Sequence, residues 1–183
     1  MLSSANPLED ILAHYQHAFQ SKLHTDTHGP SDVLMEAFGV TPEMKTAAAQ
    51  YWGRELGMCW ERLVRGLFAS NAAGFGPPLA NGAGEPCDFT VDGQAVDTKY
   101  RLGSGDSGTL RKLADNADWL RSQGFSPVML FLREDSLDTA ISRMRKAGWR
   151  VLQGDASFDF ITEHTGQDLR GFLRQNKGAW QAR

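Results

Sequence analysis

The spacing of apolar residues along the chain predicts several helices and a few short strands. Apolar side chains recur every three or four positions, the spacing of one helix face, in most of the predicted helices. The predicted helices cover residues 7–23, 33–38, 41–70, 109–123, 136–147 and 155–175. The longest opens on Thr41-Pro42-Glu43, which combines a capping residue, a proline in the first turn and a nearby acid.

Short segments of a different pattern separate these helices and predict strands. The predicted strands are 87–91, 94–101, 127–132 and 149–153, and 71–86 is a Gly/Pro-rich loop. Residues 127–132, PVMLFL, are apolar throughout, as a strand covered on both faces would be. The order of elements therefore predicts an α/β protein, a mixed β-sheet flanked by helices.

A predicted hairpin brings charged residues together. Asp92-Gly93 is a strong signal for a two-residue turn, and a turn of that length fixes the register of the flanking strands. It would place Asp88 opposite Asp97, on the same sheet face. The period of two adds Lys99 to this face. Two opposed carboxylates destabilise a sheet unless something compensates their charge.

A divalent cation would supply that compensation. Mg²⁺ prefers oxygen ligands, commonly one or two carboxylates with waters and a substrate phosphate. Asp88 and Asp97 are therefore candidate ligands, and the metal would activate a water for phosphodiester hydrolysis. The ammonium of Lys99 would orient that water or stabilise developing charge. The competing interpretation is a solvated hairpin face with an ordinary ion pair between Lys99 and one of the aspartates.

The same residues resemble the PD-(D/E)xK nuclease motif. The segments "EPCD" and "VDTK" match its two halves, with Cys87 as an extra residue between proline and acid. The segments "DTKYRLGSGDSGTLRK" and "PVMLFLREDSL" are similar to type II restriction endonucleases of the ApaLI-like group. The resemblance covers roughly residues 50–175. It implies a restriction-endonuclease-like fold with a catalytic core at 46–175, and it does not account for residues 1–45. We expect a single nuclease domain over 1–183, in which residues 1–45 are an N-terminal helical extension.

The resemblance also implies roles for particular residues. Such nucleases often carry a further acid on the helix before the hairpin, which favours Glu61 as a catalytic residue and metal ligand over Glu55. Both acids also have arginines at helical spacing and would equally serve as surface ion-pair partners. The candidate DNA contacts are polar or basic residues after the second hairpin strand: Arg101, Ser104, Ser107, Arg111 and Lys112.

The implied cofactor is Mg²⁺ and the implied substrate is double-stranded DNA. A palindromic site requires two active sites related by a two-fold axis, so the resemblance implies a homodimer. It also implies a companion DNA methyltransferase. Two alternatives remain open: a structure-specific or repair DNA nuclease of the same fold, and a catalytically silent DNA-binding module.

The composition and net charge of the chain add little to this functional prediction. The net charge is −3, but four bases and one acid lie between residues 99 and 112, which is compatible with a polyanion partner. The two cysteines cannot build a disulfide framework. We expect a cytoplasmic protein without a membrane association, because the N-terminus lacks a secretion signal and no apolar run reaches the length of a membrane span.

Three other short motifs match patterns of known functional sites. Gly103–Gly108 spells G-x-G-x-x-G, but the strand before it alternates and is charged, unlike a first dinucleotide-binding strand. "GDSG" at 105–108 matches the nucleophile segment of trypsin-like proteases, but no motif supplies its histidine or acid. His24 and His28 have zinc-compatible spacing but lie in a predicted loop without a cysteine pair.

Overall fold

The computed structural model describes residues 30–103 and 107–181, and it is an α/β protein built around one five-stranded mixed sheet. The strands are β1 (Phe75–Gly76), β2 (Phe89–Val91), β3 (Gln94–Lys99), β4 (Ser126–Phe131) and β5 (Arg150–Gln153). They are ordered β1-β2-β3-β4-β5; β2 is antiparallel to both β1 and β3, whereas β3, β4 and β5 are parallel. The mixed sheet predicted from the sequence is confirmed.

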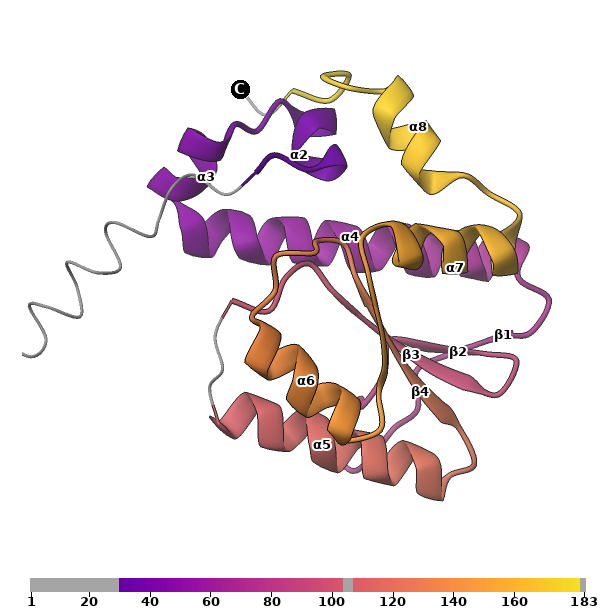
Figure 1. The fold of residues 1–183 in the computed structure, drawn as a ribbon. Coiled ribbons are helices and arrows are strands. Elements are labelled where there is room, and N and C mark those ends of the chain that lie inside the picture. The colour runs from indigo at the N-terminus through magenta and orange to yellow at the C-terminus, as the bar shows by residue number, and fades with distance from the viewer. Residues whose placement is uncertain (1–29, 104–106, 182–183) are drawn as a thin grey trace, which may run out of the picture.

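Helices cover both faces of the sheet. They are α2 (Val33–Phe38), α3 (Pro42–Ala47), α4 (Ala49–Asn71), α5 (Ser107–Ser122), α6 (Asp138–Lys146), α7 (Asp155–Thr165) and α8 (Leu169–Gln175). Figure 1 shows α4 and α7 on one face and α5 and α6 on the other, with α2, α3 and α8 forming an outer layer beyond α4 and α7. The helix predicted at 7–23 and the two histidines at 24 and 28 lie outside the described residues.

Alternation along β3 divides the core into two apolar clusters. Val96 faces the cluster that contains Trp60 and Phe68 of α4, and Ala95 faces the one that contains Leu113 of α5. This follows from the period of two, because successive side chains on a strand point to opposite faces. Leu34 of α2 also belongs to the first cluster, so residues N-terminal to position 45 contribute to the central core.

Two predicted helices are each divided in the structure. The helix predicted from 41 to 70 breaks at Ala48, whose backbone leaves the helical region (φ −140°, ψ 52°). The change of direction allows Lys45 of α3 to donate a hydrogen bond to the hydroxyl of Tyr100 (2.9 Å). The helix predicted from 155 to 175 ends at Gly166, which is left-handed (φ 68°), and α8 restarts with Asp168 as its capping residue. Within the described residues, no helix is long and apolar enough to cross a membrane.

Candidate active site

The hairpin register predicted from the turn is confirmed for three pairs and wrong for the fourth. Val91 pairs with Gln94, Thr90 with Ala95, and Phe89 with Val96. Asp88 does not continue this ladder opposite Asp97. Its backbone N–H instead donates to the carbonyl of Val96 (2.8 Å), so Asp88 and Phe89 both lie opposite one residue. This is the arrangement of a β-bulge, which re-aims a side chain.

The bulge brings the carboxylate of Asp88 against Thr98. Its Oδ2 accepts hydrogen bonds from the backbone N–H of Thr98 (2.7 Å) and from the Thr98 hydroxyl (2.6 Å). The side chain thus takes the place of the strand partner that Thr98 would otherwise have. Two donors on one oxygen fix the orientation of the carboxylate at the end of the hairpin.

Asp97 lies beside this carboxylate and is nearly fully buried. Burial raises the pKa of Asp97 to about 6; the charge of Lys99 opposes this rise, and Asp88 adds to it. The two acids therefore converge, although not as a directly opposed strand pair. An ionised Asp97 here carries a net cost, because burial and a like charge disfavour it by more than Lys99 favours it.

Lys99 is the only basic side chain among the described residues that is paired with Asp97. Its Nζ donates to Asp97 Oδ1 (2.6 Å) and to the carbonyl of Thr98 (3.1 Å). The side chain of Lys99 remains 40% exposed. Burial works to lower its pKa, but the charges of Asp97, Asp88 and Glu61 outweigh it, and the pKa of Lys99 is raised. The ammonium is therefore charged and reachable from solvent.

Of the two acids considered on α4, Glu61 is the one near the hairpin. Burial raises the pKa of Glu61, the charge of Asp88 raises it further, and Lys99 opposes both. Glu55 forms an ion pair with Arg54 (2.9 Å) on the helix surface instead. We refer below to Asp88, Asp97, Lys99 and Glu61 as the hairpin cluster.

The donor set of the hairpin cluster fits a hard cation such as Mg²⁺. Asp88 and Asp97 offer carboxylate oxygens, and one or two carboxylates with waters suffice for this ion. A cation would also relieve the repulsion that raises the pKa of Asp97. Among the described residues, no three His, Cys, Asp or Glu side chains are gathered as a metal centre. Glu61 thus does not form a three-ligand centre with the aspartates here, and its role as a ligand stays a prediction.

The candidate DNA contacts are spread over two elements. Arg101 follows β3 and donates through Nε to the carbonyl of Asp135 (3.1 Å), with the Asp135 carboxylate 3.3 Å away. Ser107, Arg111 and Lys112 are exposed on the first turns of α5. Ser104 lies outside the described residues. The structure therefore places an exposed basic helix end after the strand that carries Lys99.

A second polar cluster, which the sequence analysis missed, begins one residue after Lys99. We call Asp32, Tyr100, Arg133 and Asp135 the arginine cluster. The Arg133 guanidinium donates to Asp32 (2.9 Å) and, through two nitrogens, to Asp135 (2.7 and 2.8 Å). The Tyr100 hydroxyl donates to the same oxygen of Asp32, Oδ2 (2.5 Å). A signal was present in the sequence, since the charged triplet Arg133-Glu134-Asp135 follows the buried strand β4 after one residue, Leu132.

Comparison with known proteins adds no relative. No family model, no curated protein and no solved structure matches this chain. The function proposed below therefore rests on the residues of the site and their geometry.

Proposed function

We propose that this protein is a Mg²⁺-dependent endonuclease with a restriction-endonuclease-like core, acting as a type II restriction enzyme on double-stranded DNA. The observation that carries the proposal is the convergence of Asp88, Asp97 and Lys99 at the end of one hairpin, with the pKa of Asp97 raised to about 6. Shifted pKa values of this kind are common at functional sites. The order of α4, β2, β3, α5 and β4 also supports the proposal, since it matches the core that the motif resemblance implies.

In this proposal, each side chain of the site has a separate role. Asp88 and Asp97 would hold the metal, which when bound supplies Lewis-acid activation of a water and of the scissile phosphate. Thr98 keeps the Asp88 carboxylate oriented through its two hydrogen bonds. Lys99, partly exposed and charged, donates to the attacking water or to the phosphate oxygens as negative charge develops. Glu61 adds negative charge at the edge of this site.

Substrate contact would extend from the hairpin toward α5. Arg101, Ser104, Ser107, Arg111 and Lys112 lie on the segment that leaves β3 and enters that helix. Contacts to phosphates would supply affinity, and contacts to base edges would supply sequence choice. The proposal includes a homodimer, because a palindromic site presents two equivalent scissile bonds. It also includes a companion methyltransferase that protects the host DNA.

The test is digestion of plasmid DNA by the purified protein in Mg²⁺. We expect discrete fragments from the unmutated protein, and none from Lys99→Ala, because the mutation removes the ammonium from the site. Lys146→Ala is a matched control, since Lys146 is an exposed lysine at the end of α6. We expect it to cut like the unmutated protein. Equal cleavage by Lys99→Ala, or no cleavage of DNA from several sources by the unmutated protein, would contradict the proposal.

The same material separates the two alternatives. A structure-specific or repair nuclease of this fold would cut branched DNA and leave linear plasmid largely intact. A catalytically silent module would bind DNA with a steep dependence on salt and would not cut in Mg²⁺. The hairpin cluster favours an enzyme over the silent module, because it brings two acids and a lysine together and raises the pKa of one of the acids, Asp97, to about 6.

A further inference from the structure

A second concave site lies on the α2 side of the sheet, apart from the hairpin cluster. It has a volume of about 490 Å³, within the usual range for small-ligand pockets. Its floor is formed by the segments that follow β4 and β5, including Arg133, Glu134 and Gly154, and α2 and α8 form its walls. Ligands of open α/β sheets bind characteristically at this carboxyl end of the strands.

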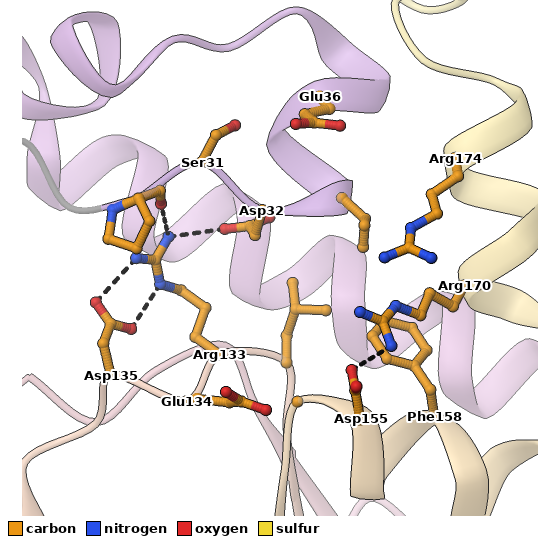
Figure 2. A pocket seen from close by; sticks show the side chains of 14 residues that line it. Ser31, Asp32, Glu36, Arg133, Glu134, Asp135, Asp155, Phe158, Arg170 and Arg174 are labelled. Atoms are coloured by element: carbon orange, nitrogen blue, oxygen red, sulfur yellow. Dashed lines mark hydrogen bonds and ion pairs between the residues drawn. The ribbon is translucent and has the colours of Figure 1, made fainter.

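Two arginines of α8 point into this pocket. Arg170 and Arg174 are four residues apart and therefore share one face of the helix. Figure 2 shows both guanidinium groups directed toward the space that faces Asp32 and Glu36 of the α2 segment. A pair of planar, permanently charged groups that converge on one space is the arrangement that proteins use to bind phosphate or carboxylate oxygens.

The donors of these arginines are not all used within the protein. Arg170 forms an ion pair with Asp155, and its guanidinium lies over the ring of Phe158 (5.8 Å to the centroid). The Nε of Arg170 is nevertheless buried without a hydrogen-bond partner in the part of the chain that the structure describes. Arg174 likewise has no ion-pair partner among the described residues. A buried donor without an acceptor is costly and indicates a missing group.

The acidic residues around the pocket are mostly neutralised. Arg133 is paired with Asp32 and Asp135 (2.9 and 2.7 Å), and Lys177 lies 3.5 Å from Glu36. The N-terminus of α7 also opens at this pocket, and the carboxyl group of Glu134 lies against Gly154, the capping position of this helix. The positive end of the α7 dipole therefore already faces a carboxylate of the protein itself.

We propose that this pocket binds a phosphate group, held by the guanidinium groups of Arg170 and Arg174. Two sources would present the same chemistry. One is a small phosphorylated molecule that enters the pocket, and the other is the backbone of a nucleic acid that lies across it. The proposal concerns a site separate from the hairpin cluster and does not require that the protein cuts DNA.

The test is calorimetric titration in EDTA, so that no cleavage occurs. Pyrophosphate is the small probe, and a short DNA duplex is the second. We expect binding of at least one probe to the unmutated protein, weakened about tenfold or more in Arg174→Gln, because a charge-assisted hydrogen bond is lost. Arg145→Gln, an exposed arginine of α6, is the matched control and should bind as the unmutated protein does.

The outcomes distinguish the two sources. Saturation by pyrophosphate with loss in Arg174→Gln would assign a small phosphorylated ligand. Binding of the duplex alone, with the same loss in that variant, would assign a nucleic-acid phosphate. The proposal is overturned if neither probe binds, or if Arg145→Gln weakens binding as much as Arg174→Gln does. Circular dichroism of each variant verifies that it is folded.

Discussion

Two polar clusters begin at consecutive residues of the same strand end, and they differ in charge balance. In the arginine cluster, Arg133 serves two carboxylates and Tyr100 donates to one of them, so each acid has donors. In the hairpin cluster, three acids share the ammonium of Lys99, and Glu61 also interacts with Arg65 and Arg62. The first arrangement is what folding requires of buried charges. The second leaves Asp88 and Asp97 with Lys99 as their shared cation, a charge balance that a bound metal ion would complete.

The two clusters also differ in how exposed their basic side chains are. The side chain of Arg133 is 4% exposed and that of Lys99 is 40% exposed. A closed, fully paired group fastens α2 to the loop after β4, whereas an open, unbalanced group faces the surface. We therefore expect stability and activity to respond to different variants, although Lys99 of one cluster and Tyr100 of the other are adjacent in sequence.

The largest effect on folding should come from Arg133→Ala. The change leaves Asp32 and Asp135 without their guanidinium, and removal of one partner from a buried ion pair costs about 3–5 kcal/mol. We expect a loss of this size in the free energy of unfolding, measured with urea. Arg143→Ala, an exposed arginine of α6, should change it little. A loss below about 1 kcal/mol, the value of an exposed pair, would show that the arginine cluster does not hold the fold.

Asp97→Asn should have the opposite effect on folding while abolishing cleavage. The rise of the Asp97 pKa from 3.8 to about 6 corresponds to a cost of about 3 kcal/mol when the group is ionised. Because the folded pKa is the higher one, that cost is absent below pH 4 and complete above pH 6. In metal-free protein, the free energy of unfolding should therefore fall between pH 4 and 6.

The variant should lose the contribution of Asp97 to this pH dependence. At pH 7 we expect Asp97→Asn to be more stable than the unmutated protein by up to about 3 kcal/mol, because the variant avoids the net cost of ionising this buried carboxyl group. Urea titrations at pH 4 and pH 7 measure both effects. Lower stability of the variant at pH 7 would mean that Asp97 is a structural acid and not a strained one.

The smallest effect should come from Thr98→Val, which tests Thr98 as a positioning residue. The variant loses one of two donors to Asp88, at about 1 kcal/mol of unfolding free energy, and keeps the backbone donor. We expect a rise of several-fold in the Mg²⁺ concentration that gives half-maximal cleavage. Thr98→Ser restores the hydroxyl and should restore the metal response. If Thr98→Val lowers the stability without changing the Mg²⁺ response, the contact is structural only.

Much of the fold was predictable because its signals are local. The Asp92-Gly93 turn, the period of two in β3 and the helical spacing of α4 and α5 each depend on residues adjacent in sequence. The breaks at Ala48 and Gly166 were missed for different reasons. Gly166 is a left-handed position that glycine favours, whereas no glycine or proline marks the break at Ala48, which accompanies a contact between Lys45 and the distant Tyr100.

The candidate site likewise combines features that local sequence predicts with features that depend on the tertiary fold. Its residues could be named from spacing along one hairpin, but the bulge at Asp88 could not, because nothing local distinguishes a bulge from a continued ladder. The arginine cluster joins positions about 100 residues apart, Asp32 and Arg133, and such pairs are set by the tertiary fold. The pocket of Arg170 and Arg174 likewise arises only when α8 packs beside α2.

The tight turn at the tip of the hairpin limits which insertions and deletions this part of the chain can tolerate. Asp92 and Gly93 both have positive φ (46° and 75°), so the turn accommodates two residues in one specific conformation. One added residue would rotate every later side chain of β3 to the other face. Lys99 would then be directed toward α4 and Tyr100 away from Asp32. Insertions and deletions at this tip should be selected against even though its own side chains touch neither cluster.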